Sequence, residues 1–138
     1  MTKKIKFKKI SEPPKKQRPK HFTIKENVFN ISIDFFYGGT LKDVLIKLDK
    51  IFPDKNFLDQ DNGTQNGKYL GWDNYSVVWI KKDSVDKVLP KIIHELVHVV
   101  ARLHDHRGIP LRYENDEVTA YLMEALFKRF YKIIYDEV

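Results

Sequence analysis

Two histidines and a glutamate in one short run are the residues of this chain that could do chemistry. His94, Glu95 and His98 belong to the run His-Glu-Leu-Val-His, inside a strongly apolar stretch from Ile92 to Leu103 that is predicted to be helical. At about 3.6 residues per turn, histidines four positions apart lie on one face, at the separation that a single zinc ion bridges. Glu95 is rotated by about 100° from His94, so it can stand beside the metal without ligating it.

These positions would support hydrolysis of an amide bond. Zinc lowers the pKa of its bound water to about 7, Glu95 accepts the proton, and the hydroxide attacks a polarised carbonyl. Glu95 would then hand the proton to the leaving amine. The competing interpretation is that the three residues are incidental members of a buried helix. Two unpartnered imidazoles and a carboxylate would be costly there, and a metal removes that cost.

The run His94-Glu95-x-x-His98 resembles the motif of the zincin metallopeptidases. The resemblance covers roughly residues 75–125 and implies a zinc-dependent peptidase that acts on proteins or peptides. It also implies that the strand expected at 75–81 lies beside the cleft and pairs with extended substrate. The layout is similar to small zincin-like proteins of bacteriophages and prophages, which implies a place in the host cytoplasm or the virion.

Two residues compete for the third ligand. Glu117 stands in Asn-Asp-Glu-Val-Thr-Ala, which resembles the glutamate-ligand branch (gluzincins) apart from the additional Asp116. His104 has the spacing of the metzincin branch, but Ala101 replaces the glycine that breaks the helix there. On an unbroken helix His104 would be turned by about 240° from His98 and lie about 9 Å along it. Glu117 is therefore favoured, with Glu114 or Asp116 as further alternatives.

Residues around the expected end of the motif helix supply weaker candidates. Tyr113, Arg112 and His106 belong to a connection that should pass near the metal, and one of them could stabilise the oxyanion. Asp116 could accept the free ring N–H of a ligating histidine. Each also has an ordinary structural interpretation, as a loop residue or as a charge that suits a helix end.

The pattern of apolar residues predicts an α+β fold: a minimal zincin-like domain, with a small β-sheet packed on the motif helix and a C-terminal helix. One or two strands are expected within 22–36, and Thr40 should cap a helix over 41–52. Residues 53–74 should be loops and turns, and 75–81 a strand. The motif helix should begin near 87–90 and stop at Gly108. The last helix should run over 116–135, capped by Asn115. Its buried side should be formed by Val118, Tyr121, Leu122, Ala125, Leu126 and Ile133. Four aromatic residues of this helix should serve packing rather than binding, namely Phe127, Phe130, Tyr131 and Tyr135.

Composition places the positive charge at one end of the chain. Residues 1–20 hold nine of the 25 basic residues and one of the 19 acidic ones, so the other 118 residues are close to neutral. We expect a flexible basic arm at 1–20 and one metal-binding domain at 21–138. The arm could make weak, non-specific contacts with nucleic acid or another acidic surface. The absence of cysteine removes thiolate zinc sites and suits a reducing, cytoplasmic compartment, and no segment is apolar enough to span a membrane.

The sequence therefore leaves two classes of function. The first is a zinc metallopeptidase in which Glu95 activates the attacking water. The second is a non-catalytic module in which zinc stabilises the helices and the basic arm docks on a partner, such as a virion surface. Glu95 favours the first, because a merely structural zinc site has no use for an unligated carboxylate.

Overall fold

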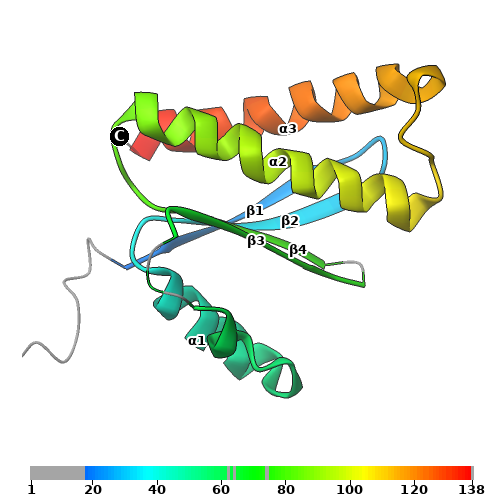
Figure 1. The fold of residues 1–138 in the computed structure, drawn as a ribbon. Helices are drawn as coiled ribbons and strands as arrows, with labels where there is room; N and C mark the ends of the chain where they lie inside the picture. Colours follow the sequence, from blue (N-terminus) through cyan, green and yellow to red (C-terminus); the bar gives the residue numbers. More distant parts are fainter. Residues whose placement is uncertain (1–17, 62, 64, 74, 138) are drawn as a thin grey trace, which may run out of the picture.

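A four-stranded mixed sheet forms the centre of the molecule (Figure 1). The computed structural model describes residues 18–137 except 62, 64 and 74. The strands are β1 (Lys20–Glu26), β2 (Ile31–Tyr37), β3 (Gly67–Trp72) and β4 (Tyr75–Ile80), in the spatial order β1-β2-β4-β3. β1 pairs antiparallel with β2, β2 pairs parallel with β4, and β4 pairs antiparallel with β3. β3 is therefore an edge strand, and β4 is paired on both sides.

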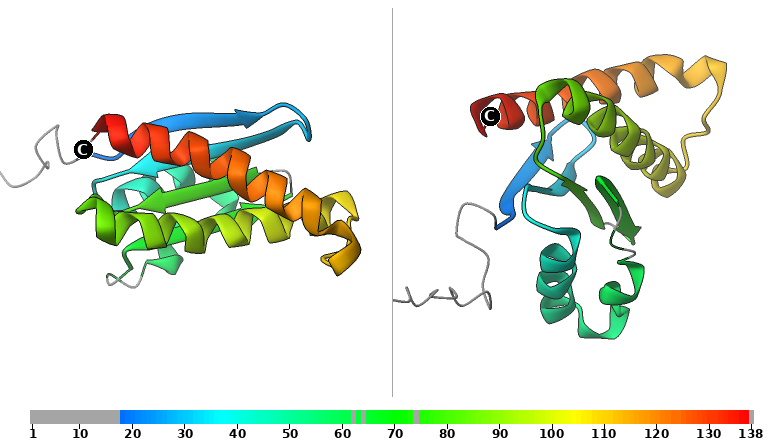
Figure 2. Two further views of the ribbon diagram at one scale, coloured as in Figure 1. Left: turned by 90° about the horizontal axis from the view of Figure 1, so that it is seen from above. Right: turned by 60° about the vertical axis from the view of Figure 1, so that its left-hand side comes forward.

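Helices cover both faces of this sheet (Figure 2). The long helices α2 (Val85–Arg107) and α3 (Asp116–Glu137) lie on one face, and α1 (Leu41–Ile51) lies on the other with two short 3₁₀ turns, Pro53–Lys55 and Phe57–Gln60. A third 3₁₀ turn, Tyr113–Asn115, precedes α3. Two hydrophobic cores result, one between the sheet and the long helices and one between the sheet and α1. The α+β fold expected from the sequence is confirmed, with α1 as an additional layer.

A buried carboxylate fastens the β1–β2 hairpin to α3. Glu26 is 6% exposed and accepts hydrogen bonds from the backbone N–H groups of Val28 and Phe29, at 2.9 and 2.8 Å, and from the Tyr121 hydroxyl at 2.8 Å. Burial by itself would raise the pKa of Glu26, but the hydrogen bonds outweigh burial and lower it. The carboxylate therefore stays ionised and holds the hairpin turn against α3.

Several expected elements are present where the sequence places them. The expected strand region divides into β1 and β2, and the Thr40 hydroxyl accepts the Asp43 N–H at 3.2 Å, which caps α1. Gly108 ends α2 with φ +66°, a conformation that favours glycine. The arm expected at 1–20 falls almost wholly outside the described residues, and Lys20 already belongs to β1.

Three expectations are wrong in detail. Residues 53–74 are not all loops, because β3 and two 3₁₀ turns lie among them. α2 begins at Val85, so Pro90 lies inside the helix rather than in its first turn. The Asn115 side chain donates to the Pro110 carbonyl at 2.8 Å. The structure gives it no contact with the first turn of α3, where a cap was expected.

The buried side of α3 also differs from the expected one. Leu122 and Leu126 are buried as expected, but Phe130 and Ile134 complete the core. Tyr121, Tyr131 and Tyr135 are 41%, 41% and 67% exposed. Tyr121 lies toward the sheet edge because its hydroxyl bonds to Glu26. Tyr131 and Tyr135, expected to serve packing, stack on each other at the surface with ring centroids 6.0 Å apart.

No helix within residues 18–137, leaving aside 62, 64 and 74, combines the length and apolar character that a membrane span requires.

Substitution of Gly71 tests the packing between β3 and α2. A Cβ atom at Gly71 would lie 2.0 Å from the Tyr69 hydroxyl oxygen and 2.9 Å from Arg102 Cδ, so the buried Tyr69 ring would have to move. We expect Gly71→Ala to destabilise the protein by about 1–3 kcal/mol, the usual effect of overpacking. Urea denaturation measures this change. An unchanged midpoint would show that the Tyr69 ring is not held as described.

Candidate metal site

The buried face and the exposed flank of α2 differ in composition. Its buried face carries apolar residues at helical spacing, namely Val88, Ile92, Leu96, Val99, Val100 and Leu103. These residues pack on the sheet and on α3, and each fully buried aliphatic side chain contributes roughly 1.5–3 kcal/mol. Because this face is fixed, the position of every other side chain around α2 is fixed as well.

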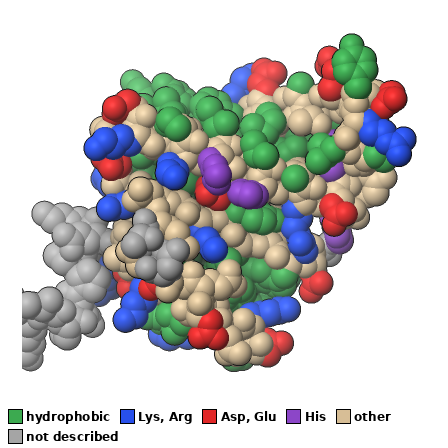
Figure 3. All heavy atoms as spheres, in the orientation of Figure 1, with side chains coloured by type: hydrophobic (Ala, Val, Ile, Leu, Met, Phe, Trp, Pro, Cys, Tyr) green, Lys and Arg blue, Asp and Glu red, His purple; other side chains and the backbone are tan. Residues whose placement is uncertain are grey.

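The His94 and His98 rings lie next to each other on the exposed flank of α2. Their ring centroids are 5.1 Å apart and the ring planes are inclined by 71°. Neither ring makes a hydrogen bond to another residue that the structure describes, so their nitrogens are free to bind an ion. Figure 3 shows a pair of histidine side chains at the surface where α2 passes over the sheet, beside an acidic side chain.

Glu95 lies beside this pair but is nearly buried, with 4% of its surface exposed. Its Oε1 atom is 3.9 Å from His94 Nε2. Burial raises the pKa of Glu95, opposed by the nearby His94, His98, Lys91 and Lys68. A carboxylate whose pKa is raised by burial beside two imidazoles is suited to exchange a proton during a reaction.

The edge strand β3 supplies the opposite wall of the site. The Tyr69 ring stacks on His98 with ring centroids 5.7 Å apart and planes inclined by 18°. The backbone of β3 passes close to the carboxylate at Gly67, where a Cβ would lie 3.4 Å from Glu95 Oε1, in van der Waals contact. Burial raises the pKa of the Tyr69 hydroxyl, so this group stays protonated at neutral pH. Tyr69 therefore positions the His98 ring, and the start of β3 lies against Glu95.

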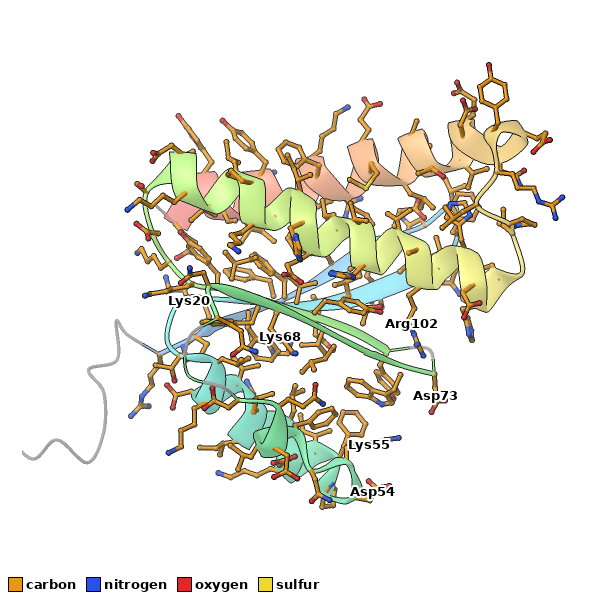
Figure 4. All side chains as sticks on the ribbon, in the orientation of Figure 1. Lys20, Asp54, Lys55, Lys68, Asp73 and Arg102 are labelled. Atoms are coloured by element: carbon orange, nitrogen blue, oxygen red, sulfur yellow. The ribbon has the colours of Figure 1, made fainter. Side chains whose placement is uncertain are left out.

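Cations surround the pair. Lys91 and Lys68 act electrostatically on Glu95, and Arg102 acts on the Tyr69 hydroxyl. Figure 4 shows Lys68 near the start of β3 and Arg102 near the β3–β4 turn, beside Asp73. Arg102 donates to the Asp73 carbonyl at 3.3 Å. The site is thus a weakly basic region with a single buried carboxylate at its centre.

Glu117, the expected third ligand, is not brought to the histidines. α2 and α3 lie side by side and run antiparallel (Figures 1 and 2), and the Thr119 hydroxyl contacts His104 Nε2 at 2.9 Å. His104 is six residues, or about 9 Å, beyond His98 along α2, and Glu117 lies farther still toward the start of α3. Glu117, Glu114 and Asp116 are all exposed there. Among the described residues, no three histidine or acidic side chains gather as a metal site would require.

His104, the alternative third ligand, has a structural task instead. It is 2% exposed, its Nδ1 lies 3.0 Å from the Ile109 carbonyl oxygen, and its Nε2 lies 2.9 Å from the Thr119 hydroxyl. A carbonyl only accepts, so Nδ1 must donate, and in this neutral tautomer Nε2 accepts from Thr119. Both nitrogens are occupied, and His104 ties α2, the connection and α3 together.

The candidates for oxyanion stabilisation lie away from the pair. His106 is eight residues beyond His98 and lines a separate pocket of about 560 Å³ with Asn30, Ser32, Asp73 and Ser76. Tyr113 is 88% exposed, in the 3₁₀ turn before α3. Arg112 is exposed in the same connection. None of these three side chains contacts His94, Glu95 or His98 in the described part of the chain.

Comparisons of the chain with protein-family models, with curated protein sequences and with solved structures find no match. The zincin resemblance therefore rests on the sequence motif of His94, Glu95 and His98.

The sequence did not identify Tyr69, Gly67 and Lys68 as part of the site. These residues belong to β3, which was expected to be a loop because residues 53–74 are rich in aspartate, asparagine and glycine. A signal was present, since Tyr69 and two glycines share one face of the strand and Leu70 and Trp72 share the other. Lys91 and Arg102 lie four residues before Glu95 and four after His98, so helical spacing could have grouped them with the site.

Zinc content measured across four alanine variants tests these assignments. We expect His94→Ala and His98→Ala to weaken zinc binding by about 100-fold or more, since each removes an imidazole of the pair. Glu117→Ala and His104→Ala should retain zinc, because neither side chain reaches the pair. Competition with a chromophoric chelator measures each affinity. Loss of zinc from Glu117→Ala as severe as that from His98→Ala would return Glu117 to the ligand set.

The pKa of Glu95 has a consequence for stability in the metal-free protein. A carboxyl whose pKa is raised in the folded state binds its proton more tightly there than in the unfolded chain. Its contribution to stability is therefore lost as pH rises above the ordinary value of 4.5. We expect Glu95→Gln to stabilise the metal-free protein at about pH 7 more than at about pH 4. Urea denaturation at both pH values measures this difference. The exposed Glu124→Gln should show no comparable pH-dependent gain, and an equal gain in both variants would refute the assignment.

Proposed function

We propose that this protein is a zinc-dependent peptidase of the zincin type, in which Glu95 moves the proton. The observation that carries the proposal is a nearly buried carboxylate beside two exposed imidazoles on one helical flank. A buried carboxylate without hydrogen-bond partners costs stability, and a catalytic role would account for its presence here. Two adjacent imidazoles without protein hydrogen-bond partners fit the donor set of a zinc ion.

In this proposal His94 and His98 would hold the ion, which would supply Lewis acidity for the substrate carbonyl and for the attacking water. Glu95 would take a proton from that water and return it to the leaving amine. Burial favours the first of these two proton transfers, because the raised pKa of Glu95 makes it a better base than an exposed carboxylate. Tyr69 holds the His98 ring in place by stacking. Among the described residues, His94 and His98 are the side chains that would hold the ion, because no third histidine or acidic side chain gathers with them as a ligand.

The proposal assigns substrate pairing to β3, which corrects the strand expected from the resemblance. β4 is paired on both sides and has no backbone edge to offer. β3 is paired with β4 alone, and its outer edge makes no backbone hydrogen bond to another described residue. An extended peptide could add to this edge as a further strand, with its carbonyl groups passing His94 and Glu95.

The non-catalytic alternative receives less support. A zinc ion stabilises a fold when it joins elements that are distant in sequence, as in small zinc-dependent domains. His94 and His98 both belong to α2, and α3 offers no ligand near them. An ion held by one helix cannot fasten two helices together, and His104 with Thr119 already does so.

Glu95→Gln separates catalysis from metal binding. We expect this variant to keep its zinc, because the imidazoles are intact, and to lose about 10²–10⁴-fold in peptide cleavage, because the proton acceptor is gone. Zinc content and the cleavage of denatured casein are measured on the same preparations. Glu124→Gln, with the same chemical change on exposed α3, should cleave normally. If the wild-type protein with zinc bound cleaves no protein or peptide, the peptidase proposal fails.

A further inference from the structure

A pocket lined by lysines adjoins the candidate site. It has a volume of about 260 Å³ and lies between the start of α2, the residue before β3 and the end of β4. Its lining consists of Lys81, Lys87, Lys91, Asn66, Asp83 and Val88. Three ammonium groups thus face one carboxylate.

The positive charge in this pocket is not neutralised within the described part of the chain. None of the three lysines forms an ion pair with a described carboxylate. Asp83 accepts a hydrogen bond from the Ser84 N–H at 2.8 Å, so part of its hydrogen-bonding capacity is used by the start of α2. The pocket therefore holds more cations than carboxylates, three lysines against Asp83, and such an excess of positive charge attracts an anion.

Lys91 connects the pocket to the reacting groups. It lines the pocket and also lies one helical turn before Glu95, whose carboxylate it influences electrostatically. Lys87 lies one turn earlier still. At about 1.5 Å per residue, these two lysines are about 6 and 12 Å along α2 from Glu95. An extended peptide advances about 3.3 Å per residue. If it runs along α2 with one bond opposite Glu95, the lysines lie opposite peptide residues about two to four positions from that bond.

We infer that this pocket selects peptide substrates with an aspartate or glutamate two to four residues from the cleaved bond. The inference rests on the proposed peptidase function and adds the class of substrate. Charge complementarity identifies the occupant, because an acidic side chain would complete the pairing that the three lysines lack. The basic N-terminal segment of this chain does not fit, since residues 1–17 hold seven lysines and one glutamate.

Lys87→Glu is the informative substitution. Lys87 is exposed in the first turn of α2, where an acidic side chain is favoured by the helix dipole, so this variant should fold. Lys132→Glu, with the same charge change on exposed α3, serves as the control. Lys87→Ala separates loss of attraction from new repulsion.

Cleavage sites in denatured casein, identified by mass spectrometry with the zinc-loaded full chain, give the first measurement. We expect acidic residues to be enriched two to four positions from the cleaved bonds for wild type and Lys132→Glu. Lys87→Glu should reduce cleavage at those sites by about fivefold to tenfold, and Lys87→Ala by less. Cleavage by the wild-type protein without any acidic preference would overturn the inference and leave the peptidase function standing.

Binding without cleavage gives the second measurement. A fluorescent Glu-Ala repeat peptide should bind the Glu95→Gln variant more tightly than a Lys-Ala repeat, with an affinity that falls as salt is raised. Adding Lys87→Glu should abolish the difference. If nothing is cleaved but this binding pattern holds, the pocket is supported and the peptidase function fails. If the two peptides bind equally, the inference fails.

Discussion

The packing of α2 against the sheet determines where every reactive side chain stands. Leu96 and Val99, fully buried between the histidines and the core, prevent the helix from turning about its axis. With that face fixed, His94 and His98 must point past the edge of the sheet, and Glu95 must lie under them against β3. The position of the site is consequently set by core packing: the apolar contacts of α2 place the two imidazoles on its exposed flank and Glu95 at the border of the buried face.

The burial of Glu95 is the costly feature of this arrangement. The carboxylate lies close to the backbone of β3 at Gly67, and among the described residues it accepts no hydrogen bond. Glu26 is also buried, but it accepts three hydrogen bonds and holds the β1–β2 hairpin against α3. The two carboxylates have pKa values shifted in opposite directions by these surroundings. The contrast shows that Glu26 is held as a hydrogen-bonded carboxylate, whereas Glu95 is buried without such bonds among the described residues; the proposed proton transfer would give Glu95 a role.

Local patterns predicted those parts of the fold that depend on neighbours in sequence. Thr40 and Gly108 were identifiable because a capping hydroxyl and a left-handed glycine act within a few residues. The His94–His98 pair was identifiable because helical periodicity is local too. β3 was missed because its glycines resemble turn residues, and their purpose depends on Glu95 and Arg102, which are distant in sequence. Glu117 was favoured as a ligand by motif similarity. Its position depends on how α3 lies along α2, and the contact between His104 and Thr119 places the start of α3 near His104 rather than near the histidine pair.

The open edge of β3 has a consequence for how molecules of this protein meet one another. An unpaired strand edge that could receive a peptide could equally receive the same edge of a second molecule. β3 has six residues, two of them glycine, and a lysine at its second position. A short edge that carries a lysine pairs poorly with its own copy, because two such strands form few hydrogen bonds and bring like charges together. The strand is thereby kept accessible while self-association in concentrated solution is discouraged.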